Sequence, residues 1–329
     1  MPAPARIGAQ RPRRKEALPA GPPPASPVFA LYPGMAAATP GMGRPLARNR
    51  AAQAVFDEFR RTSGTDVGRL VAGAGDAELF ADRAWELAIV ATEIAAFEAF
   101  TAAGGVVSGG FGFSIGAYAA LRNAGMVDVG QVVAMVDCVL DASRALPGSY
   151  GMAAITGPSR ESVEALCRPG AVEVAAVLGA GLVLVAGERE ATDRLCAEIS
   201  PRALRVSSLR VRWPLHTTLM TPVAADLGRR REAIGRLRPL RHPVYSGLDG
   251  SRVTSPSEGW ELLVRHLIRP QRLDLAIGAM VAAGPAEFVE MGTGSTLARS
   301  VSRLTGPDAA VRAFPPWSGD RTRGASKRC

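Results

Sequence analysis

The sequence contains little cysteine, almost no lysine and few histidines. Its four cysteines are widely spaced and form no C-x-x-C pair, so neither a zinc cluster nor a redox motif is indicated. We therefore expect reduced thiols in a cytoplasmic protein that binds no metal. Hydrophobic residues make up 47% of the 329 positions and charged residues 21%. This balance excludes a disordered, collagenous or disulfide-scaffold protein and predicts a sizeable core.

The formal net charge is +9, but most of it lies at the two ends of the chain. Residues 1–26 carry a net charge of +4 and residues 315–329 carry +3, which leaves +2 for the rest. We expect both ends to be disordered basic tails. Because no basic stripe with interleaved aromatic residues accompanies the charge, we expect no nucleic-acid partner.

The N-terminal segment lacks the apolar run of a secretory signal, since only charged and proline-rich sequence follows its first residues. One uncharged stretch, residues 99–121, is long enough to span a bilayer, but it contains six glycines. A buried strand, turn and helix accounts for it better. We expect no membrane association.

Strands alternate with helices over most of the chain, which predicts an α/β fold with a mainly parallel sheet. The expected helices begin near Leu46, at Asp76 as N-cap, at Ala117 and at Pro222, and two more cover residues 258–268 and 273–283. The expected strands cover residues 28–32, 106–108, 244–246 and 287–290.

The middle of the chain has a different pattern. Strands are expected at residues 150–156, 172–178, 182–186 and 204–211, and helices at 159–167 and 190–199. The order β-α-β-β-α-β is typical of a ferredoxin-like arrangement. It predicts a subdomain over residues 148–212, inserted into a body formed by residues 27–147 and 213–314.

The sharpest local motif is Gly112-Phe113-Ser114-Ile115-Gly116, which stands between an expected strand and an expected helix. This G-x-S-x-G pattern in a strand–turn–helix context is typical of a nucleophile elbow. It places Ser114 at a helix N-terminus, where free N–H groups favour a developing anion. The alternative is a glycine-rich turn with an incidental serine.

A serine hydroxyl needs a base, and the chain offers only three histidines. His216 lies in a loop after an expected strand, where catalytic groups are often held. His242 precedes a proline at the start of a strand and His266 lies within a helix, so we interpret both as structural residues. His216 is the candidate base.

Seven blocks of sequence together resemble the malonyl-CoA:acyl-carrier-protein transacylase family, which includes the acyltransferases of fatty-acid and polyketide synthesis. The resemblance runs from about Val28 to Leu304. It is carried by residues 32–34 with 41–43, 112–118, 151–155, 185–190, 216–220, 263–265 and 289–294. It implies an α/β-hydrolase-like body with a ferredoxin-like insertion and an active site between the two.

The resemblance also implies residue roles. Ser114 corresponds to the nucleophile and His216 to its general base, which the family orients by a backbone carbonyl around Arg265-His266 instead of an aspartate. The backbone N–H groups of Met35 and Ile115 correspond to the oxyanion hole, with Met35 in the place of a glutamine. An acyl group would pass from acyl-CoA or another thioester through an acyl-serine to an acyl carrier protein, with no bound cofactor.

Three departures from the family pattern concern the acyl pocket. Val139 stands where malonyl-specific members have the arginine that grips the free carboxylate. Phe113 replaces a histidine, and Trp213 and Leu215 replace the usual residues before the catalytic histidine. We therefore predict a substrate other than malonyl, such as a larger or neutral acyl chain passed between carriers. The alternative is that another arginine acts as the clamp and the enzyme is an ordinary ACP malonyltransferase.

Further alternatives concern the fate of the acyl group and the docking of the carrier. Arg299 and Arg303 are candidates for steering an acidic carrier protein, or are simply a solvated helix face. The same Ser114 and His216 would serve an editing thioesterase, in which water resolves the acyl-serine. A non-catalytic carrier-docking protein is the third possibility.

Overall fold

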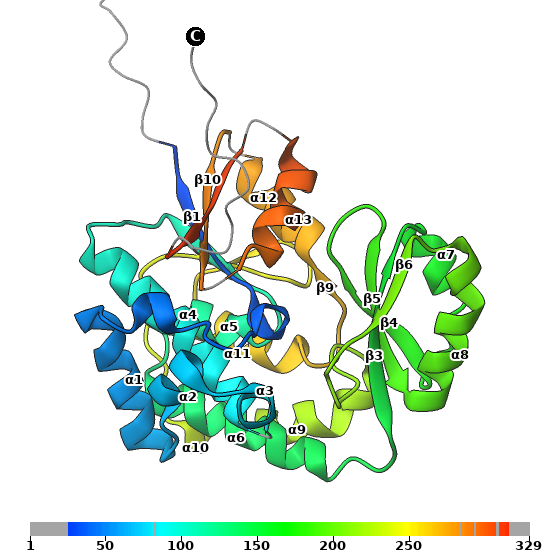
Figure 1. The fold of residues 1–329 in the computed structure, drawn as a ribbon, viewed down its shortest axis with the longest axis horizontal. Coiled ribbons are helices and arrows are strands. Elements are labelled where there is room, and N and C mark those ends of the chain that lie inside the picture. Colours follow the sequence, from blue (N-terminus) through cyan, green and yellow to red (C-terminus); the bar gives the residue numbers. More distant parts are fainter. Residues whose placement is uncertain (1–25, 82, 283, 293, 307–308, 316–329) are drawn as a thin grey trace, which may run out of the picture.

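The computed structural model describes residues 26–315, except 82, 283, 293 and 307–308. The predicted tails, 1–26 and 315–329, and the end of the helix predicted over 273–283 therefore lie wholly or largely outside the described residues. Two sheets stand side by side, each covered by helices (Figure 1). Within the described part of the chain, no helix is long and apolar enough to cross a membrane.

The first sheet has six strands in the order β11-β10-β1-β2-β7-β8. Neighbouring strands run parallel except for the β7–β8 pair. Tyr32 at the end of β1 pairs with Gly112 at the end of β2, so the loops after these two strands begin at the same edge. The strands are β1 (Val28–Tyr32), β2 (Gly109–Gly112), β7 (Val244–Tyr245), β8 (Arg252–Val253), β10 (Glu287–Met291) and β11 (Ala310–Phe314).

Alternate side chains of this sheet pack against helices on opposite faces, as expected for a parallel sheet buried on both sides. Phe29 and Leu31 face helices α12 and α13, whereas Ala30 and Tyr32 pack against the large helical layer that includes α4 and α5. The helices around this sheet are α1 (Arg50–Ser63), α2 (Val67–Gly73), α3 (Asp76–Leu79), α4 (Ala84–Ala102), α5 (Gly116–Asn123), α6 (Val129–Arg144), α9 (Thr221–Arg229), α10 (Arg231–Ile234), α11 (Pro256–Arg265), α12 (Leu273–Val281) and α13 (Thr296–Thr305), with the short 3-10 helices η1 (Gly34–Ala37), η2 (Arg44–Leu46) and η4 (Thr218–Met220).

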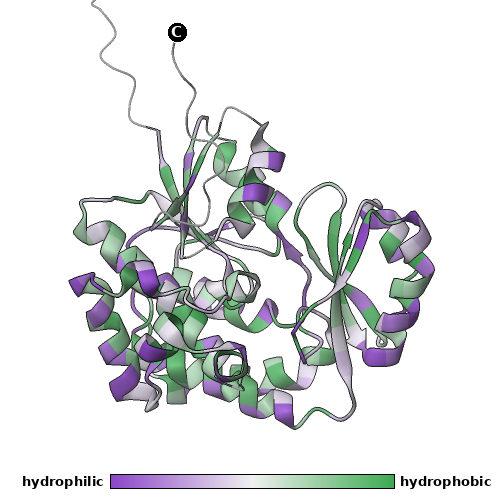
Figure 2. Cartoon of the chain, viewed as in Figure 1, coloured by the Kyte–Doolittle hydropathy of each residue, from purple (hydrophilic) through white to green (hydrophobic). Residues whose placement is uncertain are grey.

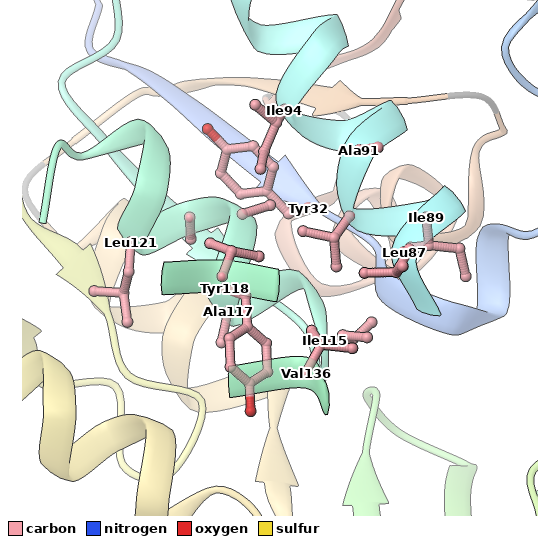
Figure 3. Packing of buried hydrophobic residues seen from close by; sticks show 14 of the residues in the cluster. Tyr32, Leu87, Ile89, Ala91, Ile94, Ile115, Ala117, Tyr118, Leu121 and Val136 are labelled. Atoms are coloured by element: carbon pink, nitrogen blue, oxygen red, sulfur yellow. The ribbon is translucent and has the colours of Figure 1, made fainter. Parts of the chain in front are cut away.

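Helix α4 is the central element of the helical layer. Nearly every residue from Trp85 to Phe100 is buried, so the helix is apolar on all sides. Figure 3 shows its residues Leu87 and Ile94 near Tyr32, Ile115 and the first turns of α5. Helices further out, such as α1, carry hydrophilic residues on their outer faces (Figure 2). The elbow between β2 and α5 thus packs against a buried apolar core.

The second sheet has the order β6-β3-β5-β4-β9 and is antiparallel except for the β4–β9 pair. Helices α7 and α8 cover one face through Val163, Leu195 and Ile199. The other face presents Met152 and Ala186 toward the segment that precedes His216. The elements are β3 (Tyr150–Thr156), α7 (Arg160–Glu164), β4 (Val172–Val177), β5 (Leu182–Glu188), α8 (Arg189–Ile199), η3 (Ser200–Arg202), β6 (Arg205–Ser208) and β9 (Gln271–Arg272).

The strand predicted at residues 106–108 is wrong. Val106 is 77% exposed, and the chain becomes a strand only at Gly109, where it pairs with β1 and β7. Sequence preference favoured the valines because β-branched residues suit strands and glycines do not. Here glycines are required, because β2 leads directly into the tight turn at Ser114.

The single long helix predicted from Asp76 is also wrong. Gly75 precedes the short helix α3, which ends at Leu79, and α4 starts anew at Ala84. Between them Arg83 has a φ of 68°, which is incompatible with a helix, and its guanidinium bonds both carboxylate oxygens of Asp137 on α6. Sequence periodicity gives no sign of this long-range ion pair.

Strands β8, β9 and β11 were not predicted, because β8 and β9 have two residues each and β11 depends on pairing with β10.

Candidate active site

Ser114 occupies a strained turn between β2 and α5. Its φ is 55°, a left-handed conformation that costs free energy in any residue except glycine. Close packing explains the flanking glycines: a Cβ at Gly112 would lie 2.2 Å from the Gly116 carbonyl oxygen, and one at Gly116 would lie 2.4 Å from the Tyr32 carbonyl oxygen. The turn therefore needs glycine on both sides of the serine.

His216 approaches Ser114 from a segment 102 positions further along the chain. Its Nε2 lies 2.8 Å from Ser114 Oγ, and its Nδ1 lies 2.5 Å from the backbone carbonyl oxygen of His266. A carbonyl oxygen can only accept, so Nδ1 carries the proton and Nε2 is free to accept one from the serine. The backbone N–H of His216 also donates to the Leu267 carbonyl, at 2.8 Å, which fixes the segment.

Burial keeps the His216 imidazole neutral. The side chain is 3% exposed, and desolvation lowers its pKa to about 4, against the opposing effect of the bond to the His266 carbonyl. Burial likewise lowers the pKa of His266 to about 3, with a smaller contribution from His216. A neutral imidazole with a free Nε2 can take the hydroxyl proton of Ser114.

Two backbone N–H groups of the same cavity lining as Ser114 have no hydrogen-bond partner among the described residues. Met35 lies in η1, just after β1, and Ile115 is the N-cap of α5. Within the described residues, no hydrogen bond engages the backbone N–H of either residue. Met35 and Ile115 line a common cavity with Ser114. Free donors at the start of a helix are suited to stabilising a developing oxyanion.

Sequence reasoning missed Glu93, whose carboxyl supports the loop that carries Met35. Glu93 Oε1 accepts the backbone N–H of Gly34 at 2.6 Å, and the side chain is 2% exposed. Burial raises the pKa of this carboxyl well above its usual range, with a further rise from Glu290. An acidic residue inside the apolar run of α4 was the available signal, because buried carboxyls are rare without a role.

Two cavities meet at Ser114 and His216. The outer one, of about 430 Å³, lies between the loops of the first sheet and the free face of the second. The inner one is small, about 50 Å³, and apolar side chains form most of its lining. The outer cleft is lined by Met35, Ala38, Thr39, Pro40, Asp76, Phe80, Trp85, Phe113, Ser114, Met152, Leu184, Ser208, Leu209, Arg210, Val211, Leu215 and His216.

A family model of the acyl transferase domain matches residues 28–314, which include every element of this site. The chain belongs to this family. It is therefore an acyltransferase.

Relatives of this acyltransferase include proteins named for malonyl transfer and proteins of polyketide synthases. The malonyl CoA-acyl carrier protein transacylase of Bacillus subtilis (strain 168) is 28% identical over 289 residues, which cover 85% of this chain and 90% of that protein. The spectinabilin polyketide synthase system protein NorB of Streptomyces orinoci is 30% identical over 81% of this chain, but the match spans only 13% of that longer protein.

Solved structures show that the acyltransferase shares its mixed α/β fold with malonyltransferases. The malonyl-transacylase solved in complex with a type II polyketide synthase acyl-carrier protein has 26% identity and a TM-score of 0.83, with 89% of this chain and 97% of that chain covered. The acyl-carrier-protein S-malonyltransferase of Burkholderia pseudomallei 1710b has 26% identity and a TM-score of 0.82, with 88% and 97% covered.

The inner cavity of the acyltransferase brings together three of the four predicted pocket residues. Val139, Trp213 and Leu215 line it, whereas Phe113 lines only the outer cleft. Neither arginine nor lysine is among its lining residues. The lining is completed by His266, which was predicted only for its backbone carbonyl, and by five residues that were not predicted: Glu86, Tyr118, Val136, Leu140 and Leu267.

The remaining candidates lie outside both cavities. Arg299 and Arg303 are exposed and four residues apart on α13, so they share one face of that helix, and neither lines the outer cleft or the inner cavity. The His242 ring lies near the backbone carbonyl of the next residue, Pro243, and is not part of the site. Among the described residues, no cluster of three or more His, Cys, Asp or Glu side chains is arranged to hold a metal.

Proposed function

We propose that the acyltransferase moves an acyl group from a thioester to the phosphopantetheine thiol of an acyl carrier protein through an acyl-Ser114 intermediate. The main support for this proposal is the series of hydrogen bonds from Ser114 Oγ through His216 to the His266 carbonyl. Its mechanism follows from this geometry.

In the first step, Ser114 Oγ attacks the thioester carbonyl while His216 Nε2 accepts the hydroxyl proton. The N–H groups of Met35 and Ile115 stabilise the tetrahedral oxyanion, each contributing about 3 kcal/mol. Collapse breaks the C–S bond, and the departing thiolate takes the proton from the His216 imidazolium. In the second step, the carrier's thiol gives its proton to His216 and attacks the acyl-serine, and Ser114 regains its proton as it leaves.

The partners and the architecture belong to the same proposal. The substrates are acyl-CoA and acyl carrier protein, the two carriers that the name of the Bacillus subtilis relative contains. The proposed reaction needs no bound cofactor. The order β-α-β-β-α-β and the two sheets support an α/β-hydrolase-like body over 27–147 and 213–314 with a ferredoxin-like subdomain over 148–212. A cytoplasmic location and docking of the carrier on Arg299 and Arg303 stay predictions.

The inner cavity favours a short, neutral acyl group. Its volume of about 50 Å³ is small beside the outer cleft of about 430 Å³, which favours a short chain over a long one. A malonyl carboxylate would face Val139, Trp213 and Leu215 there, and an unpaired buried carboxylate costs several kcal/mol. The malonyl group of the named relatives is the second candidate substrate, and it requires an arginine from elsewhere in the chain to reach this end of the cavity.

Replacing Val139 by arginine is expected to raise the rate of malonyl loading about 10- to 100-fold relative to acetyl loading. The guanidinium would supply the charged partner that the wild-type lining lacks. Stopped-flow or quenched-flow mass spectrometry of the acyl-enzyme measures both rates. Val139→Met serves as the control, because it adds comparable length without charge. Wild-type protein that already loads malonyl as fast as acetyl would contradict the proposed substrate class.

The pH dependence of acyl-enzyme formation is expected to follow the neutral form of His216. Because its pKa is lowered to about 4, the imidazole remains an active base as the pH falls from 8 toward 5. Below about pH 4 it is protonated, and kcat/KM should fall about tenfold per pH unit. Single-turnover pH jumps keep the protein folded during the measurement. A midpoint near 6.5, the ordinary histidine value, would contradict this account.

The whole proposal is tested by intact-protein mass spectrometry after incubation with a panel of acyl thioesters, followed by addition of holo carrier protein. Transfer predicts a mass increase of one acyl group at Ser114 and its discharge onto the carrier thiol. An editing thioesterase would release free acid at the same rate with or without the carrier. No adduct with any thioester would leave only the carrier-docking alternative.

A further inference from the structure

A third cavity, of about 340 Å³, opens beside the cleft that contains Ser114. Three of its lining residues are arginines, Arg189, Arg210 and Arg212, and one, the buried Glu86, is acidic. We call this cavity the arginine groove. It is continuous with the outer cleft through six shared residues: Met35, Phe80, Trp85, Leu209, Arg210 and Val211.

The arginines of the groove come from two different parts of the fold. Arg189 is the first residue of α8, on the side of the second sheet, whereas Arg210 and Arg212 belong to the segment between β6 and His216. A ligand in the groove would therefore meet guanidinium groups from two directions. The same segment connects the groove directly to the catalytic histidine.

One of the three guanidinium groups is anchored and two are available. Arg210 pairs with Asp76 at 3.1 Å and lies 4.6 Å above the ring of Phe80, which holds it at the rim. Arg189 and Arg212 are exposed, and neither forms an ion pair with any residue that the structure describes. Exposed arginines gathered in a concave site without carboxylate partners are suited to an anionic ligand.

We propose that the arginine groove binds the phosphate end of the pantetheine-linked substrate while its thioester lies at Ser114. This inference rests on the proposed function, because it assumes an acyl thioester in the adjoining cleft. The guanidinium fork matches phosphate oxygens in pairs, and the two guanidinium groups of Arg189 and Arg212, which have no ion-pair partner among the described residues, favour an anion. Both CoA and a carrier-bound arm bear such phosphates.

The experiment compares one acyl group on three donors: acyl-pantetheine, which has no phosphate, acyl-CoA, and acyl-carrier protein. The double variant Arg189→Gln/Arg212→Gln removes the two available charges at exposed positions. We expect kcat/KM for acyl-Ser114 formation to fall about 10- to 100-fold with a phosphate-bearing donor and to stay unchanged with acyl-pantetheine. Arg48→Gln/Arg50→Gln, at exposed positions outside the groove, is the control for net charge.

The pattern across donors identifies the source of the phosphate. If kcat/KM falls with both acyl-CoA and acyl-carrier protein, the groove binds the phosphate that the two arms share. If it falls with acyl-CoA alone, the groove binds the phosphates specific to CoA. If it falls with the acyl-carrier protein alone, the groove binds the phosphodiester of the carrier. No loss with either, or an equal loss that includes acyl-pantetheine, overturns the inference. Failure of the proposed function looks different, because wild-type protein would then form no acyl-Ser114 with any of the three donors.

Discussion

Replacing Ser114 by alanine is expected to abolish the acyl-enzyme and to lower kcat for acyl transfer by about 10⁵-fold. The reason is that Ser114 Oγ, 2.8 Å from His216 Nε2, is the hydroxyl that is hydrogen-bonded to this base in the described part of the chain. Intact-protein mass spectrometry should then show no acyl adduct with any thioester. Binding of the thioester should persist, because the cleft and its lining are unchanged.

The matched control for this variant is Ser257→Ala, which removes an exposed hydroxyl in the first turn of α11. It should retain wild-type activity and still form the adduct. An adduct that survives in Ser114→Ala would place the nucleophile elsewhere and contradict the proposed mechanism. A positive φ at position 114 disfavours alanine as much as serine, so thermal unfolding of the variant should be measured beside its activity.

Replacing His216 by alanine is expected to lower the rate of acyl-enzyme formation by about 10⁴-fold or more. Without the imidazole, no base accepts the proton of the Ser114 hydroxyl, and the departing thiolate has no proton donor. The Met35 and Ile115 N–H groups remain, so a residual rate above the uncatalysed reaction should persist. Single-turnover loading with a short-chain acyl-CoA measures both the loss of rate and the residual rate.

His242→Ala is the appropriate comparison for His216→Ala, since His242 lies outside the catalytic cleft and the inner cavity. His266 does not serve, because its ring lines the inner cavity. Loss of activity in His242→Ala with unchanged thermal stability would show that the site extends beyond the cluster described above. Retention of more than a tenth of the wild-type rate in His216→Ala would show that another group takes the serine proton.

The elbow at Ser114 could be predicted because its requirements are local. Two glycines and the helix that follows them are properties of about a dozen consecutive residues, and close backbone packing demands the glycines. The strand at β1 and the helices α5 and α8 were likewise expected close to their observed bounds. Short-range periodicity and turn chemistry suffice for such elements.

Other features depended on contacts between distant residues and were missed. Helix α3 ends before α4 because Arg83 leaves the helical conformation and pairs with Asp137, which is 54 positions away. Glu93 supports the Met35 loop through a bond across 59 positions. Strand β9 joins the second sheet through two residues that carry no strand pattern of their own. No local window of sequence contains these partners.

The sequence by itself determined the type of fold, the serine elbow and the choice of His216 among three histidines, because each rests on residue types and local spacing. The resemblance implied a backbone carbonyl around Arg265-His266 and an acyl pocket with Val139, Trp213 and Leu215. Only the tertiary structure decided that the carbonyl is that of His266, that the pocket has a volume of about 50 Å³, and that three arginines line a groove beside the cleft. Distances, burial and charge pairing arise when separate segments pack together, and no single segment encodes them.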